Sequence, residues 1–298
     1  MTILKNSTLL PLTALMMMSF NTVAKDVDKT LDWLSGGELK VDITSGQIDI
    51  RGWDDEQIKL TGEFDGDDDQ LVFKTSGKDV KLEIRDQHTS WWGNSSHNSA
   101  NFIVYVPFDS DLDIEGTSLE IEVNQVKGAL EVNSISGSIQ ANGPSDRVDI
   151  ESISGNIEIE DASGKVRLRT VSGDIKADVE ANSFVAKTVS GDIDGRIGRS
   201  EYVSTLSVSG DVEIELSLVS DARVEGQTVS GDLEFDFVDQ INADFELNTG
   251  PGGDIRNKLS DHQPEDSSHW GQVLNFTLGD GDTTIELETM SGNISLKN

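Results

Sequence analysis

The chain has 298 residues, with 55 acidic and 23 basic side chains and a formal net charge of −32 at pH 7. It contains no cysteine, which excludes disulfides and cysteine metal ligands, so packing and strand hydrogen bonds must hold the fold. A charge this negative opposes binding to nucleic acids and to anionic membrane surfaces, because both carry charge of the same sign.

The first 24 residues are predicted to be a secretory signal peptide. Lys5 precedes an apolar run from Leu9 to Phe20, and the segment ending at Ala24 fits the small-residue cleavage pattern. No later segment has 18 consecutive apolar residues, so we expect no membrane span after cleavage. Loss of Lys5 would change the net charge from −32 to −33. The sequence therefore predicts export, either to the periplasm or to the surface or exterior of a bacterial cell.

Residues 25–110 are predicted to form an all-β cap that is continuous with the repeats that follow. The segment 39–50, LKVDITSGQIDI, already has the repeat pattern around Gly46. Strand-like runs follow at 58–64, 71–74, 80–85 and 102–106, joined by irregular acidic turns. Because a stack of repeats needs its open end covered, we expect this region to close one end.

Residues 111–298 carry a Ser-Gly turn seven times within a frame of β-branched residues. The turn glycines are Gly137, Gly155, Gly173, Gly191, Gly210, Gly231 and Gly292, with successive spacings of 18, 18, 18, 19, 21 and 61 residues. A period near 20 residues, combined with strand-like alternation, predicts an all-β fold: a parallel β-solenoid of roughly 18–21-residue coils.

Apolar residues recur at four positions of each coil. They lie seven and two residues before the turn glycine and two and four residues after it, as in Val166, Val171, Ile175 and Ala177. Their alternation with polar residues predicts that all four rows stack into one narrow core. The hydroxyl residue three positions before the glycine, such as Thr170, is also expected to point inward and to bond a backbone carbonyl or a neighbouring hydroxyl.

The turn glycines, including Gly46, are expected to be structural, because a turn of this kind needs a residue with positive φ. The next residue is aspartate in four successive coils: Asp174, Asp192, Asp211 and Asp232. Carboxylates about 4.8 Å apart repel one another, so we expect solvent screening and local backbone capping, with bound Ca²⁺ as the alternative. Calcium-binding β-rolls carry a G-G-x-G-x-D run at both turns, whereas this chain has Gly-Asp at only one, so no cofactor is predicted.

Charges on neighbouring coils are expected to pair and to fix the register, as in Glu151 with Arg169 and Asp149 with Arg167. The small basic cluster is therefore interpreted as counter-charge, not as an anion-binding patch; it comprises Lys165, Arg167, Arg169 and Lys187. Further on, residues 256–272 are predicted to bulge out as a loop insertion, before the last Ser-Gly coil closes the stack.

Two loops, 88–97 and 261–271, hold all four histidines and three of the five tryptophans. An exposed tryptophan beside polar residues can stack on a sugar ring or contact a partner. The candidate ligand-binding residues are Trp91, Trp92, His97, His269 and Trp270. Packing within the loops is the simpler interpretation, and no metal site is predicted because the histidines lack a ligand-like spacing.

Three features together resemble the bacterial putative-adhesin family of β-solenoid domains of unknown function. They are the repeated T-V-S-G-D-I turn, the I-x-I-R-G-W-D run at Ile48–Asp54, and the V-P pair at Val106–Pro107. The resemblance covers nearly the whole mature chain and implies a β-solenoid. It supplies no catalytic motif, and it implies an association with envelope-stress regulation.

Two classes of function follow from these observations. The first is an exported, non-catalytic solenoid that binds a protein or glycan of the cell envelope or cell surface, in an adhesin-like or an envelope-stress-linked periplasmic role. The alternative is a polysaccharide-active β-helix enzyme, which would need paired carboxylates about 5–10 Å apart. The sequence favours the first, because it has no catalytic motif and no non-repeated cluster that combines Asp, Glu, Lys and Arg stands out. The oligomeric state is left open.

Overall fold

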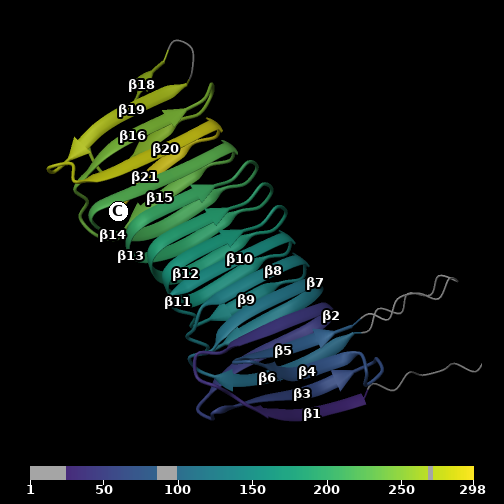
Figure 1. Cartoon of the computed structure of the whole chain (residues 1–298). Helices are drawn as coiled ribbons and strands as arrows, with labels where there is room; N and C mark the ends of the chain where they lie inside the picture. Colours follow the sequence, from purple (N-terminus) through teal and green to yellow (C-terminus); the bar gives the residue numbers. More distant parts are fainter. Residues whose placement is uncertain (1–24, 86–98, 268–270) are drawn as a thin grey trace, which may run out of the picture.

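The computed structural model describes residues 25–85, 99–267 and 271–298, and all regular elements in these ranges are β-strands. The strands of successive coils lie side by side and build a long column (Figure 1). Successive coils pair in parallel and in register, so the predicted parallel β-solenoid is confirmed. Within the same ranges, no helix is found that could cross a membrane.

Each coil has two strand segments that pack face to face, one before the Ser-Gly turn and one after it. We call the stack of segments before the turn the first layer and the stack after it the second layer. The strands of the regular coils are β7 (Asp111–Asn124), β8 (Leu130–Ser136), β9 (Ile139–Asn142), β10 (Arg147–Ser154), β11 (Ile157–Arg169), β12 (Ile175–Lys187), β13 (Ile193–Leu206), β14 (Val212–Ser230) and β15 (Leu233–Phe237).

The core lies between the two layers and runs through the whole column as one cluster of buried side chains. Equivalent residues stack directly on one another; Val166, for example, pairs with Phe184, and Phe184 with Val203. Burial of each such side chain contributes about 1.5–3 kcal/mol, so the stacked apolar rows are the main source of stability. Three of the four predicted apolar rows occupy this core.

The prediction that the fourth row is buried is wrong. Its seven residues are 38–53 % exposed; they are Ile135, Ile153, Val171, Val189, Val208, Val229 and Met290, and we call them the apolar row. Adjacent positions of a strand point to opposite faces, and the preceding hydroxyl residue occupies the inward position with 0–6 % exposure. Thr170 and Thr188 donate from Oγ1 to the carbonyl oxygens of Gly155 and Gly173, each at 3.2 Å. This bond satisfies the buried hydroxyl, and the apolar side chain next to it is left facing outward.

The expected reason for the turn glycines also needs correction. Of the eight, only Gly46 and Gly137 have positive φ, 126° and 110°. The other six are stacked so closely that a Cβ on each would collide with the carbonyl oxygen of the turn glycine in the adjacent coil, as for Gly191 over Gly173. Close approach of backbones in adjacent coils, more than turn conformation, therefore requires glycine here.

The C-terminal coils do not stack in the order in which they follow along the chain. Their strands are β16 (Ala243–Thr249), β17 (Ile255–Asn257), β18 (Glu265–Asp266), β19 (Gln272–Leu278), β20 (Thr283–Ser291) and β21 (Ile294–Lys297). The prediction that the last Ser-Gly coil closes the stack is wrong, because β20 inserts between β14 and β16. The Gly292 turn matches the Gly231 turn and stacks directly on it, and β19 then pairs antiparallel with β16.

The N-terminal end is closed in a similar way by antiparallel strands. The strands there are β1 (Lys25–Asp32), β2 (Glu38–Trp53), β3 (Gln57–Phe64), β4 (Leu71–Ser76), β5 (Asp79–Ile84) and β6 (Ala100–Pro107). β2 is a complete coil in register with β7, while β4 pairs antiparallel with β5 and β3 with β6 and β1. The edge strand β1, KDVDKTLD, is rich in charge, which discourages pairing with other chains.

Candidate functional site

The five candidate ligand-binding residues, Trp91, Trp92, His97, His269 and Trp270, lie outside the residues that the structure describes. One nearby histidine is described: the Nδ1 of His262 lies 3.0 Å from the Ser260 hydroxyl, and its ring stacks on Phe276 with centroids 5.2 Å apart. For this histidine, the contact with Ser260 and the packing against Phe276 of β19 account for the position of the side chain.

The four stacked aspartates cap backbone groups of the adjacent coil. The Oδ1 of Asp174 accepts from the Asp192 N–H at 3.0 Å, and the Oδ1 of Asp192 accepts from the Asp211 N–H at 2.8 Å. Asp211 and Asp232 continue the ladder toward Asn293. At least one oxygen of each carboxylate is therefore engaged in the turn, and both are in Asp232. Across the described ranges no group of three His, Asp or Glu side chains is placed to hold a metal ion.

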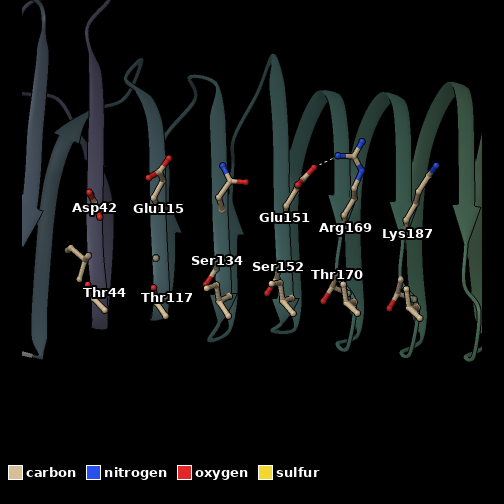
Figure 2. Close-up of a pocket in the computed structure, with 18 of the residues that line it drawn as sticks. Asp42, Thr44, Glu115, Thr117, Ser134, Glu151, Ser152, Arg169, Thr170 and Lys187 are labelled. Atoms are coloured by element: carbon tan, nitrogen blue, oxygen red, sulfur yellow. Dashed lines mark hydrogen bonds and ion pairs between the residues drawn. The ribbon is translucent and has the colours of Figure 1, made fainter. Parts of the chain in front are cut away.

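A groove of about 670 Å³ runs along the first layer across seven coils, and we take it as the candidate site. The apolar row forms one side of it, from Ile135 to Val208, and is continued by Thr44 and Thr117. The buried hydroxyl row forms its floor (Figure 2). The other side is a row that points outward four positions before each turn and is polar except at its last member; we call it the polar row, and it comprises Asp42, Glu115, Asn133, Glu151, Arg169, Lys187 and Leu206.

The backbone along the apolar row is already hydrogen-bonded between coils. The Ser172, Ser190 and Ser209 amides donate to the carbonyl groups of Ile153, Val171 and Val189 at 2.8–2.9 Å. The groove therefore offers side chains, not free peptide groups, and a ligand cannot extend the sheet here. With coils about 4.8 Å apart, the seven apolar side chains form a strip about 29 Å long.

Charge along the polar row changes sign once within the groove. Asp42, Glu115 and Glu151 lie toward the N-terminal cap, and Arg169 and Lys187 lie on the next two coils, as Figure 2 shows. At the acidic end, a hydrogen bond from Lys40 to Glu38 raises the pKa of Lys40 above its ordinary value.

The two ion pairs predicted within the basic cluster are confirmed: Arg169 pairs with Glu151, and Arg167 lies 3.0 Å from Asp149. In the described part of the chain, Lys165 and Lys187 form no ion pair.

The sequence contained a signal for this site that the apolar pattern obscured. Thr170 and Val171 are consecutive, and strict alternation allows only one of them to face inward. The sequence predicts that both Thr170 and Val171 face the core, and these two expectations exclude each other. If the threonine hydroxyl faces inward, the valine must face outward. The groove presents apolar and charged side chains to solvent.

The fold and this groove define a capped β-solenoid with an exposed apolar row along one layer. A family model described as Toastrack DUF4097 matches residues 36–250, and the chain belongs to this family. The resemblance found in the sequence, to a putative-adhesin family of unknown function, is thereby confirmed.

Solved structures with similar folds share little sequence with this chain. A putative adhesin from Bacteroides fragilis is 11% identical, covers 92% of this chain and 98% of its own, and has a TM-score of 0.49. A putative lipid binding protein from Parabacteroides distasonis is 11% identical, covers 92% of this chain and 96% of its own, and has a TM-score of 0.39. These likenesses are too distant to carry a function, and no curated protein matches the chain.

Proposed function

We propose that this chain is an exported, non-catalytic protein of the bacterial envelope with an adhesin-like role, and that it binds its partner through the groove. The exposed apolar row carries the proposal. Seven aligned apolar side chains facing solvent cost stability in a monomer unless another surface covers them. Contiguous apolar surface of this kind, with a polar margin, is typical of interaction sites.

The composition of the row favours the apolar side chains of a protein over a sugar ring. All seven members are aliphatic, and none offers the flat aromatic face on which a pyranose stacks. The flanking charges are arranged to orient a partner more than to add affinity, because exposed ion pairs contribute only about 0–1 kcal/mol each.

The binding role is tested with a double variant, Val171→Asp with Val189→Asp. We expect it to remain folded, because both side chains point outward, and to lose at least about tenfold in binding, because two charges would be buried against an apolar partner. The measurement is co-sedimentation of the purified mature chain with outer-membrane, peptidoglycan and surface-polysaccharide fractions of its host.

Val238→Asp is the matched control, since Val238 is also exposed but lies outside the groove. Equal melting temperatures for the control and the double variant exclude unfolding as the cause of lost binding. If the unsubstituted chain sediments with none of the fractions, or if the control loses as much binding as the double variant, the proposal is wrong.

Export is tested by protease treatment of intact and permeabilised host cells, with mass spectrometry of the N-terminus. We expect a mature chain that begins near Lys25. Cleavage on intact cells would support adhesion to external polymers, and protection until permeabilisation would support a periplasmic partner. An uncleaved N-terminus in the cytoplasm would contradict both.

A further inference from the structure

We infer that the groove docks a second copy of this chain, with the two solenoids lying side by side and antiparallel. The inference rests on the proposed docking role of the groove and names its partner. It follows from the order of charges along the polar row, from the geometry of stacked coils, and from the charge on the remaining surface.

The polar row changes sign along its length, so reversing it about the Glu151 coil sets the acidic Glu115 opposite the basic Lys187. Read from the N-terminal cap, it is acidic at Asp42, Glu115 and Glu151 and then basic at Arg169 and Lys187. An isologous dimer needs such a pattern, since each patch must meet its own counterpart across the twofold axis. A pattern of one sign along the whole groove would repel its own copy.

The solenoid geometry lets two rows meet without mismatch. A twofold axis parallel to the strands reverses the order of the coils but keeps every row opposite itself. The apolar row of one copy would therefore lie against the apolar row of the other. With the axis at the Glu151 coil, in the middle of the groove, Glu115 of one copy lies opposite Lys187 of its partner.

Two charges of the polar row lack partners that such a dimer would supply. Glu115 and Lys187 are exposed, and neither forms an ion pair within the ranges that the structure describes. Glu151 and Arg169, by contrast, pair within the chain at the point where the sign changes. The unpaired charges thus lie on either side of the coil through which the proposed twofold axis passes.

The rest of the column opposes other modes of self-association. The second layer and its turn carry the exposed aspartate ladder and strands rich in acid, such as IEIED in β11 and VEIEL in β14. At a net charge of −32, two copies repel except where basic side chains are concentrated, which is beside the groove. The antiparallel strands at both ends oppose head-to-tail stacking of coils.

Sedimentation velocity of the mature chain over a range of concentrations and salt tests the inference. We expect a monomer–dimer equilibrium that disappears in the double variant Val171→Asp with Val189→Asp and persists in Val238→Asp. Glu115→Lys and Lys187→Glu should each weaken the dimer about tenfold, because each places like charges opposite one another. An equimolar mixture of these two single variants should restore it, since lysines 115 and 187 of one chain would then face glutamates 187 and 115 of the other.

A chain that stays monomeric at its highest soluble concentration overturns the inference, and so does a mixture that fails to restore the dimer. If the monomeric chain still sediments with an envelope fraction in a manner that depends on Val171 and Val189, the docking role holds and only the identity of the partner is wrong. If the dimer forms and no envelope fraction is bound, the inference holds, and the proposed binding to a component of the cell envelope is wrong.

Discussion

Two consecutive residues, Thr170 and Val171, show how hydrogen bonding decides which side chain faces the core. Burial of the valine instead of the threonine would remove more apolar surface from water. It would also expose a hydroxyl that otherwise bonds a glycine carbonyl of the neighbouring coil, here Gly155. The turn brings these carbonyl groups to the inner edge of the first layer, where a short hydroxyl side chain reaches them and a valine cannot satisfy them.

A pair of valine substitutions tests the value of this bond. Thr188→Val removes the hydroxyl that bonds the Gly173 carbonyl, and we expect a loss of about 1 kcal/mol in the free energy of unfolding. Thr205→Val is the matched control, because the Oγ1 of Thr205 is buried and makes no hydrogen bond. We expect it to stabilise the fold by about 1 kcal/mol, since an unsatisfied buried hydroxyl is removed. Denaturant unfolding of both variants checks the difference; equal effects would contradict it.

At the scale of the strands, the order of the C-terminal coils is set by matching turns. β20 and β21 have the same rows and turn as β14 and β15, so they pair with them in register. The 243–257 coil has the sequence NTGPGG in place of a Ser-Gly turn and is placed one coil further out. Pairing across 61 residues costs little more loop-closure entropy than pairing across 21, because that cost grows only with the logarithm of loop length.

Engineered cysteine pairs distinguish this order from the order of the sequence. Gln227 and Glu288 are direct partners on adjacent coils, and Asn248 is the partner of Glu288 on the coil beyond. In a chain without cysteine, Gln227→Cys with Glu288→Cys should therefore oxidise to a disulfide, because adjacent strands place the Cα atoms about 5 Å apart. Gln227→Cys with Asn248→Cys, two coils apart, should not. Peptide mapping by mass spectrometry identifies which pair forms a disulfide. If only the second pair does, the coils stack in the order in which they follow along the chain.

At the scale of the whole molecule, the column joins one continuous core to a strongly acidic surface. Stacking repeats the same turn at each coil and so brings four aspartates into one line, each of which still accepts a backbone N–H from the next coil. The local hydrogen bond is favourable, while the accumulated charge is not.

Salt is therefore expected to raise the melting temperature of the mature chain. Each kcal/mol gained by screening should raise it by about 2–4 °C in a domain of this size. Changing Asp174, Asp192, Asp211 and Asp232 to Asn keeps the Oδ1 acceptors and should reduce the dependence on salt. The measurement is thermal unfolding in NaCl and, at equal ionic strength, in CaCl₂. A larger increase with Ca²⁺, reversed by EDTA, would show that the ladder binds cations and would contradict a purely structural role.

The amino-acid sequence alone is enough to predict the repeat, the number of Ser-Gly coils, the position of the turns and three of the four apolar rows of the core. These follow from period and alternation, which are local properties of a strand. Contacts between coils place Val171 and its equivalents outward, because in five of the seven coils the hydroxyl beside the apolar residue bonds a glycine carbonyl of the adjacent coil. The same kind of contact places the Gly292 coil on the Gly231 coil. Both outcomes depend on contacts between residues far apart in the chain, and a local pattern cannot specify such contacts.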